Sequence, residues 1–352
     1  MYKSSRGLFP FFILIVSTIV ILNSCSNDRN PFGCEDNLIE DNFIGKLESD
    51  FGNYAILKPD GTLWTWGNNY NGQLGIGTKE SSNIPLKVSS IEKIIDIDFC
   101  EGMALAVDCA GNIWYWGRNT FSSTMGPEIL SPKKISFLRG TEAIEMCFVV
   151  HTLRNDGTVW QIKIDHKVNT SYYNPEIISG MEQILSISNS LALKKDGTLC
   201  EILSSEPDRG GWIAVKDVVA VQNVLNRRTV ILKKDGTAWA WGKNGIGQLG
   251  SGDFQDSSVP VKVKNLSNII KISANYDFNL ALREDGTVWF WGFICQWDAN
   301  QNPIGINIPE RIKNLDNVVL IHAGSQCLVM KDDGSYWYFA AEDRIPQKIS
   351  FE

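Results

Sequence analysis

Histidines are the side chains best suited to acid–base and metal chemistry near neutral pH, and this sequence has three, at positions 151, 166 and 322. His151 follows the apolar residues 148–150, and His322 follows the apolar residues 319–321. We interpret both as structural histidines of apolar strands, with their hydrogen bonds satisfied. No His-x-x-x-His or Cys-x-x-Cys spacing occurs, so the sequence predicts no zinc site.

Other chemistry has little support in the sequence. Residues 298–302 alternate oxygen-bearing side chains as a calcium loop does, but Pro303 stands where the sharp-turn glycine belongs. The Gly-x-Ser-x-Gly elbow of serine hydrolases is missing, and the glycine-rich stretches around Gly72 and Gly247 lack the Gly-Lys-Ser/Thr ending of a phosphate-binding loop. Paired carboxylates for glycoside hydrolysis could converge from distant parts of the chain, yet nothing in the sequence names a pair. We therefore expect no catalytic residue, no metal and no cofactor.

One cysteine stands in a position where its thiol would be modified. Residues 1–24 begin with Lys3 and Arg6, continue with a 15-residue apolar run and end in small and polar residues directly before Cys25. This order is typical of a secretory signal, and the apolar run is shorter than the roughly 20 residues of a membrane-spanning helix. Residues 22–25 resemble the bacterial lipoprotein signal. The resemblance implies that Cys25 is lipidated and becomes the N-terminus; an ordinary signal peptide or an uncleaved anchor is the alternative.

The seven other cysteines are predicted to be mainly buried thiols. They stand at positions 34, 100, 109, 147, 200, 295 and 327. Because their number is odd, at least one must be a free thiol. A domain of this size has a core large enough to be stable without disulfides, so we favour small buried hydrophobic residues over a disulfide framework. Cys109, in a turn segment, is expected to be more exposed than the others.

Charge and composition restrict the partners. The chain has 352 residues and a net charge of −7, and removing residues 1–24 would take away two positive charges and no negative one, leaving −9. No basic cluster appears after the signal, which argues against a nucleic-acid partner. The polar residues 25–42 are interpreted as a tether. The sequence thus predicts an acidic envelope protein, anchored in the outer rather than the inner membrane, since Ser26 offers no inner-membrane retention signal of the Asp type.

A sevenfold internal repeat occupies residues 43–352. Each copy has an apolar strand, a tight turn ending in glycine and a second strand with aromatic residues at alternate positions. The intervals between the turn glycines range from 39 to 50 residues, the period of propeller blades. These glycines are Gly61, Gly111, Gly157, Gly197, Gly236, Gly286 and Gly334. The pattern predicts seven hairpins, because Asp-Gly supplies the positive φ that a tight hairpin turn requires.

The strand after each glycine repeats large side chains at the third and fifth positions, which fall on one face of a strand. We predict that they pack between blades and form no binding site. The pairs are Trp64 and Trp66, Trp114 and Trp116, Trp160 and Ile162, Cys200 and Ile202, Trp239 and Trp241, Trp289 and Trp291, and Trp337 and Phe339.

Two repeats are nearly identical in their longest motif. Trp-Thr-Trp-Gly-Asn at 64–68 leads to Gly-Gln-Leu-Gly at 72–75, and Trp-Ala-Trp-Gly-Lys-Asn at 239–244 leads to Gly-Gln-Leu-Gly at 247–250. With these motifs the chain resembles the regulator of chromosome condensation repeat family, whose members are seven-bladed β-propellers. The resemblance implies an all-β propeller over residues 43–352. Ring closure between the N- and C-terminal strands is expected, with one blade built from both termini.

The function expected from the resemblance is non-catalytic protein binding, here by a monomeric, lipid-anchored protein with an envelope or extracellular protein as partner. The third and fourth repeats, about residues 141–215, have lost the Gly-Gln-Leu-Gly element and carry Tyr172, Tyr173 and Trp212 outside the repeat positions. Trp297 is also off the pattern, in a segment predicted to be an irregular loop. We predict these four aromatic residues as partner-binding residues; filling of gaps in the repeats is the alternative. A glycan-binding or glycan-processing role at the central channel is the second function considered.

Overall fold

Short strands joined by turns make up almost all of the structure, a computed structural model. It describes residues 44–50, 52–100, 102–118, 127–135, 140–146, 150–164, 173–188, 191–202, 212–213, 215–224, 228–299 and 303–351. The predicted signal, the lipidated Cys25 and the tether over 25–42 lie outside the described residues. In the described part, no helix is long and apolar enough to cross a bilayer.

Twenty-eight strands of this part form seven antiparallel sheets of four consecutive strands. Sheet 1 consists of β1 (Lys46–Asp50), β2 (Asn53–Leu57), β3 (Leu63–Gly67) and β4 (Ser82–Lys87). Sheet 2 consists of β5 (Ile94–Cys100), β6 (Met103–Asp108), β7 (Ile113–Gly117) and β8 (Ile129–Ile135). Sheet 3 consists of β9 (Thr141–Met146), β10 (Val150–Arg154), β11 (Val159–Ile164) and β12 (Tyr173–Ile177). Sheet 4 consists of β13 (Ile184–Ser188), β14 (Leu191–Lys194), β15 (Leu199–Glu201) and β16 (Trp212–Ile213). Sheet 5 consists of β17 (Val218–Val224), β18 (Arg228–Lys233), β19 (Ala238–Gly242) and β20 (Ser257–Lys262). Sheet 6 consists of β21 (Ile269–Ala274), β22 (Phe278–Arg283), β23 (Val288–Trp297) and β24 (Pro303–Arg311). Sheet 7 consists of β25 (Val318–Ala323), β26 (Cys327–Lys331), β27 (Tyr336–Phe339) and β28 (Gln347–Lys348).

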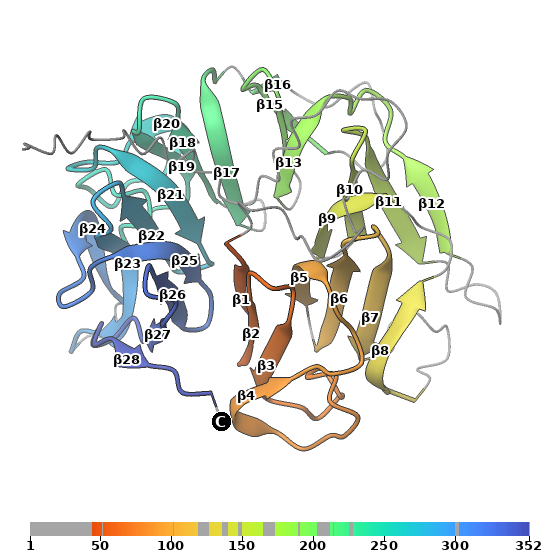
Figure 1. The fold of residues 1–352 in the computed structure, drawn as a ribbon. Helices are drawn as coiled ribbons and strands as arrows, with labels where there is room; N and C mark the ends of the chain where they lie inside the picture. Colours follow the sequence, from red (N-terminus) through yellow and green to blue (C-terminus); the bar gives the residue numbers. More distant parts are fainter. Residues whose placement is uncertain are drawn as a thin grey trace, which may run out of the picture.

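The seven sheets stand around a central axis as the blades of a propeller (Figure 1). The first strand of each sheet contacts the first strand of the next, and β25 of the last sheet contacts β1 of the first. These seven inner strands therefore surround the channel. The predicted fold, an all-β seven-bladed propeller whose ring closes between its N-terminal and C-terminal sheets, is confirmed.

One detail of the expected closure was wrong. Among the described residues, no sheet combines strands from both ends of the chain, because sheet 1 consists of β1 to β4 and sheet 7 of β25 to β28. The strand missing from the prediction is β1, whose Lys46, Glu48 and Asp50 alternate with Leu47 and Ser49. Such an alternation of polar side chains does not look like an apolar core strand. The ring closes by contact between two complete sheets.

Each Asp-Gly turn is held by side chains of its own blade. In sheet 1, Gly61 has a φ of 75°, and Oδ1 of Asp60 accepts hydrogen bonds from the backbone N–H and the hydroxyl of Thr62. The indole Nε1 of Trp64 donates to that hydroxyl, and the ammonium of Lys58 lies 4.4 Å from the Trp64 ring. Sheets 3, 5 and 6 repeat the whole arrangement around Trp160, Trp239 and Trp289. The aromatic residues three positions after the glycines are thus half-buried turn caps.

The side chains five positions after the glycines form the packing between blades. Trp116 and Trp291 are fully buried, and Trp66 and Phe339 nearly so. Their surroundings are apolar side chains of two neighbouring sheets, so that the core is a ring of clusters rather than one centre. The prediction that these residues pack between blades is confirmed for these four.

The cysteines follow the prediction only in part. Cys200 and Cys327 are buried free thiols, as expected, and Cys295 is a half-buried free thiol. Cys109 corrects the prediction: it is disulfide-bonded, and it is buried rather than exposed. The position of Cys109 in the repeat did not indicate this disulfide.

Candidate functional site

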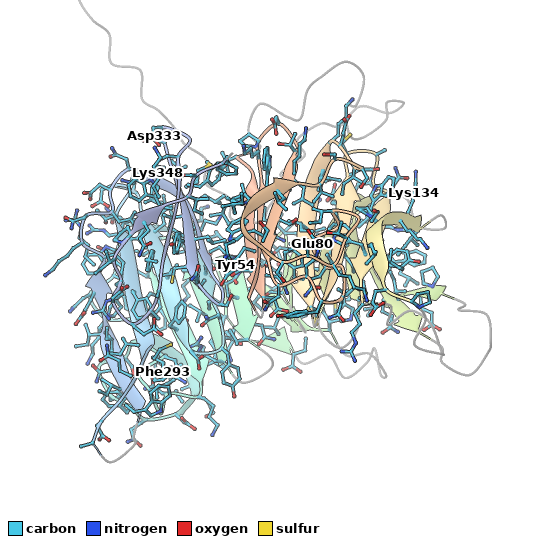
Figure 2. All side chains as sticks on the ribbon, turned by 90° about the horizontal axis from the view of Figure 1, so that it is seen from below. Tyr54, Glu80, Lys134, Phe293, Asp333 and Lys348 are labelled. Atoms are coloured by element: carbon cyan, nitrogen blue, oxygen red, sulfur yellow. The ribbon has the colours of Figure 1, made fainter. Side chains whose placement is uncertain are left out.

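The two ends of the sheets differ in character. The Asp-Gly turns lie at one end, and the connections from first to second and from third to fourth strands lie at the other, which we call the loop face. Figure 2 shows this separation, since Asp333 of an Asp-Gly turn and Phe293 of β23 lie at opposite ends of the molecule. The loop face carries the longest connections, so it has the most freedom to diverge from the repeat.

Two glycine-rich loops on this face are rigid and join neighbouring sheets. In the loop after β19, the buried Asn244 donates from Nδ2 to the carbonyl of Asp253 and accepts the N–H of Leu249. The loop carbonyl of Gln248 accepts hydrogen bonds from Nε1 of Trp291 at 3.0 Å and from Nδ2 of Asn279 at 2.9 Å, both in sheet 6. The loop after β3 bonds Trp116 of sheet 2 in the same way, through the carbonyl of Gln73.

Five exposed apolar side chains lie on loop-face segments of sheets 5, 6 and 7. Trp297 is 56% exposed, and the other four are between 38% and 59% exposed. We call this set the apolar patch: Phe254, Tyr276, Trp297, Ile304 and Ile345. Water is a poor solvent for such surface, so several large apolar side chains on connected loops indicate a contact site.

Hydrogen bonds connect the segments that carry the apolar patch. The loop of Phe254 is joined to β24 by the N–H of Gly252, which donates to the carbonyl of Asn307 at 2.8 Å. The turn of Tyr276 is joined to β23 by the N–H of Phe293, which donates to the carbonyl of Asp277 at 3.0 Å.

The rest of the patch is joined in the same manner. Nε2 of Gln296 donates to the carbonyl of Glu342, in the loop of Ile345. Trp297 itself packs edge-on against Phe293, with 5.2 Å between ring centroids. Trp297 pairs with Pro303 across the hairpin of β23 and β24, and Ile304 pairs with Gln296, so Trp297 and Ile304 lie on opposite faces of that hairpin. The five side chains are therefore mounted on one connected scaffold.

A buried arginine holds the Tyr276 turn in place. Nη2 of Arg228 donates to the carbonyl of Asn275 at 2.6 Å, and Nδ2 of Asn275 donates to the carbonyl of Gly324 in sheet 7 at 2.6 Å. Burial lowers the pKa of Arg228 to about 10, so its guanidinium is still charged at neutral pH. This chain of bonds runs through sheets 5, 6 and 7, the three sheets beneath the patch.

The segments around the apolar patch are acidic. They carry six carboxylates and two cations: Asp253, Asp256, Asp277, Asp298, Glu342 and Asp343, with Lys243 and Arg344. Lys243 pairs with Asp256 at 2.7 Å, and Arg344 pairs with Glu310 of β24 at 3.7 Å. Hydrogen bonds from the backbone of Gln255 and the hydroxyl of Ser251 lower the pKa of Asp253, which keeps it ionised. The segments of the patch thus carry more carboxylates than cations, with Lys264 acting on Asp253 and Arg228 on Asp277 from neighbouring segments.

The channel holds a second group of polar residues. Nζ of Lys46 in β1 donates to Oδ1 of Asp96 in β5 at 2.7 Å. The other oxygen of Asp96 accepts the N–H of Ile144 in β9 at 2.9 Å, so that one buried carboxylate links three blades. Glu48 lies 3.7 Å from Lys46, and burial raises its pKa to about 7 although Lys46 lowers it.

Two segments of the chain are similar to a known protein repeat. Residues 60–107 and 235–282 match the regulator of chromosome condensation (RCC1) repeat. Two of the seven repeats of the chain are thus similar to the RCC1 repeat. Each matched segment starts at an Asp-Gly turn and ends in the second strand of the next sheet, so an RCC1 repeat is offset by two strands from a blade.

Among curated relatives, the mouse E3 ubiquitin-protein ligase HERC2 is 23% identical over 310 residues, which cover 81% of this chain and 6% of HERC2. The Arabidopsis thaliana ultraviolet-B receptor UVR8 is 26% identical over 240 residues, 66% of this chain and 49% of UVR8. This chain thus spans half or less of these two relatives. Among solved structures, Prp20p of Saccharomyces cerevisiae, described with its binding properties to Gsp1p and histones, has a TM-score of 0.66 at 17% identity. The match covers 82% of this chain and 85% of that one, and it shows a shared fold.

The structure places the three described residues of the predicted partner-binding set on three different sheets. Tyr173 lies on β12 and Trp212 on β16, the outer strands of sheets 3 and 4, while Tyr172 lies outside the described residues. Trp297 lies at the end of β23 in sheet 6, which sheet 5 separates from sheet 4. The expectation that Trp297 occupies an irregular loop was wrong, because β23 is ten residues long, longer than its counterparts, and pairs with β24.

Sequence reasoning missed the companions of Trp297 in the patch. Phe254 follows an intact Gly-Gln-Leu-Gly element of an RCC1 repeat, and Tyr276 lies between two ordinary repeat strands. Their common signal was an aromatic residue away from the repeated positions. Exposure and the pairing of β23 with β24 were needed to recognise them.

The predicted structural histidines differ from each other. Nε2 of His322 accepts the N–H of Ser49 at 3.0 Å, as expected of a satisfied histidine. His151 is buried, and burial lowers its pKa to about 4, but its Nε2 has no hydrogen-bond partner among the described residues. No three metal-ligating side chains come together within the part of the chain that the structure describes.

Proposed function

We propose that this protein is a lipid-anchored propeller of the cell envelope that acts as a non-catalytic protein-interaction module. The apolar patch is the proposed binding surface. The observation that carries the proposal is the presence of Phe254, Tyr276, Trp297, Ile304 and Ile345 on hydrogen-bonded segments of three adjacent sheets. Large aromatic side chains held on a rigid scaffold lose little conformational entropy on binding, which makes them effective contacts.

The charge around the patch supports a polypeptide with basic residues as the partner. Six carboxylates against two cations would attract lysine and arginine side chains and repel acidic ones. The similarity to Prp20p, a propeller described as binding the proteins Gsp1p and histones, supports protein binding as the use of this fold. The identity of the partner is not carried over from that protein.

The anchoring rests on the sequence of residues 1–25. A charged start, an apolar run and a small residue before Cys25 support export, lipidation and placement in the outer membrane. Radiolabelled palmitate should be incorporated into the wild-type chain and not into a Cys25→Ala variant. Labelling of both proteins would remove lipidation of Cys25 from the proposal without affecting the binding surface.

The glycan-processing alternative gains no support from the channel. Catalysis of that kind needs two carboxyl groups available to a sugar. Oδ1 of Asp96 is bonded to Lys46 and to its own strand, and Oδ2 is bonded to Ile144. Glu48 is held between Lys46 and His322.

The test is affinity capture from detergent-solubilised envelope with the full-length chain carrying a C-terminal tag. A Trp297→Ala, Tyr276→Ala double variant removes two aromatic rings of the patch. Tyr70→Ala is the matched control, because Tyr70 is 74% exposed and lies on the loop after β3 in sheet 1. We expect one polypeptide that the wild type and the control retain, that the double variant releases and that rising salt weakens.

Each other result has a definite meaning. Equal retention by all three proteins would place the binding surface elsewhere. Retention of a polysaccharide in place of a polypeptide would favour the glycan alternative. Capture of neither would contradict the proposed function.

A further inference from the structure

Cys109 is disulfide-bonded, and its partner is a cysteine outside the described residues. The other described cysteines keep their thiols: Cys100, Cys200, Cys295 and Cys327. The candidates that remain within the chain are Cys25, Cys34 and Cys147. The position of Cys109 in the propeller distinguishes between them.

Cys109 lies at the end of the sheets that carries the seven glycine turns, which we call the turn face. Its N–H donates to the carbonyl of Lys93 at 2.8 Å, directly before β5. The next residue, Ile94, donates its N–H to the carbonyl of Gly61 in the glycine turn of sheet 1, at 3.0 Å. Cys109 therefore lies where the turns of sheets 1 and 2 meet.

Cys147 follows a strand that leads away from this position. β9 starts at the turn face, where the N–H of Thr141 donates to the carbonyl of Gly111 at 3.4 Å, and it ends with Met146 at the loop face. An extended strand separates Thr141 from Met146 by about 17 Å, and one further residue adds a step of about 3.8 Å. Because the Cα atoms of bonded cysteines lie within about 7 Å of each other, Cys147 is excluded as the partner.

The segment that follows Cys34 enters the propeller at the turn face. Lys46, the first residue of β1, pairs with Leu57, the last residue of β2 before the glycine turn of sheet 1. Gly45 packs so closely against the carbonyl of Leu57 that a Cβ would overlap with it. The chain from Cys34 to Gly45 can span about 35 Å when extended, and the two adjoining turns of sheets 1 and 2 lie between Gly45 and Cys109. Cys34 is therefore within reach of Cys109.

We propose that Cys34 and Cys109 form a disulfide that fastens the tether to the turn face of the propeller. Cys25 is excluded because its sulfur carries the lipid, a step that rests on the proposed function. Forming the bond takes two protons and two electrons from the two thiols. A protein disulfide of the oxidising envelope accepts them by thiol–disulfide exchange and becomes a dithiol.

This bond sets the lipid and the apolar patch at opposite ends of the molecule. Between Cys25 and Cys34 the chain can span about 30 Å, so the bond keeps the turn face near the bilayer. The residues of the apolar patch lie on loop-face segments. The proposed binding surface then points away from the membrane.

Peptide mapping of the full-length protein without reduction tests the disulfide. The protein is alkylated while it unfolds, so that thiols cannot exchange, and mass spectrometry of the digest identifies linked peptides. We expect one linked pair that contains Cys34 and Cys109, and an alkylated Cys147. A link from Cys109 to Cys25, to Cys147 or to a second copy of the chain, or an alkylated Cys109, would overturn the proposal.

The same mapping of a Cys25→Ala variant separates the disulfide from the lipid anchor. We expect the Cys34–Cys109 pair in this variant too, because the bond needs no lipid. If palmitate labelling shows that Cys25 is not lipidated while the pair is present, the anchoring fails and the disulfide stands.

Substitution provides a second measurement of the bond. A disulfide restricts the unfolded chain, so Cys34→Ser should lower the melting temperature by about 5 °C. Cys34→Ser added to Cys109→Ser should cause no further loss, because either change alone breaks the bond. Cys295→Ser, which changes a half-buried thiol, is the matched control and should lower the melting temperature less. No loss in Cys34→Ser, or additive losses in the double variant, would overturn the proposal.

The orientation is measured on the lipidated protein in vesicles that contain phosphatidylethanolamine. An amine-reactive cross-linker joins exposed lysines to the lipid headgroups, and the yield at each lysine is divided by its acetylation rate. We expect Lys93, exposed on the turn face, to be cross-linked about tenfold more than Lys243, exposed on the loop face. Equal yields, or a higher yield at Lys243, would overturn the orientation.

Discussion

The backbone N–H of Ser49 donates a hydrogen bond of 3.0 Å to Nε2 of His322, a residue 273 positions further along the chain. Ser49 belongs to the first inner strand and His322 to the last, so this bond crosses the junction where the ring closes. Similar bonds join other blades: the N–H of Ala323 donates to Ser273, and the N–H of Asn223 donates to Ser188. A side-chain acceptor on one inner strand thus holds the backbone of the next.

The closing bond predicts a dependence of stability on pH. His322 must be neutral to accept at Nε2, and burial with the charge of Lys46 lowers its pKa to about 3, below the ordinary value near 6.5. The contribution of neutral His322 to the stability of the fold is complete above the pKa of this histidine in the unfolded chain, and it is lost as pH falls towards about 3. His322→Gln keeps an acceptor that does not titrate. Between about pH 7 and pH 4.5, the free energy of unfolding measured with denaturant should fall by about 2 kcal/mol less in the variant than in the wild type. An equal fall in both proteins would contradict this role.

The Asp96–Lys46 ion pair is predicted to affect the free energy of unfolding mainly when one of the two partners is removed. In Asp96→Asn the largely buried ammonium of Lys46 would lose its closest charge, which should lower the free energy of unfolding by about 3 kcal/mol. Adding Lys46→Met to Asp96→Asn removes the unpaired charge and should restore part of the loss. Denaturant unfolding of the four proteins in this cycle measures the coupling. Simple additivity of the two substitutions would show that the pair is not coupled.

The glycine-rich loops are predicted to tolerate no side chain where they contact the next blade. Gly250 has a φ of 65°, and a Cβ there would lie 2.8 Å from Cγ1 of Val263 and 3.0 Å from Cδ1 of Trp291. Gly250→Ala should therefore cost about 3 kcal/mol, the sum of backbone strain and overpacking. Gly180→Ala is the matched control, because its φ is 75° with no atom within 4 Å of a Cβ, and it should cost about 1 kcal/mol. Similar melting temperatures of the two variants would argue against a packed loop.

The two tryptophans of β23 are predicted to have opposite roles. Trp291 is fully buried and bonded to Gln248, so Trp291→Ala should destabilise the protein by about 4 kcal/mol. Trp297 is 56% exposed, so Trp297→Ala should cost less than about 1 kcal/mol while weakening partner binding. Chemical denaturation combined with the capture experiment separates these effects. A large loss of stability in Trp297→Ala would identify it as a packing residue.

The repeats of the sequence were sufficient to predict the fold. Six Asp-Gly turns and one Ala-Gly turn at a regular interval, with aromatic residues at alternate positions, follow from local backbone and strand geometry, which neighbouring residues determine. The strand at which each blade begins was harder to predict, because the matched RCC1 repeat starts between the second and third strands of a sheet. This offset, together with the polar appearance of β1, explains the wrong prediction of a blade shared by both termini.

The sequence by itself thus determined the number of blades, the turns and the residues that pack between blades, because each depends on contacts within one hairpin or on a repeated position. Only the tertiary structure decided which off-pattern residues meet. Trp297 was predicted and Phe254 and Ile345 were not, since their neighbourhood depends on contacts between three sheets. The disulfide of Cys109 was likewise hidden, because its position in the repeat does not show which cysteine lies within bonding distance.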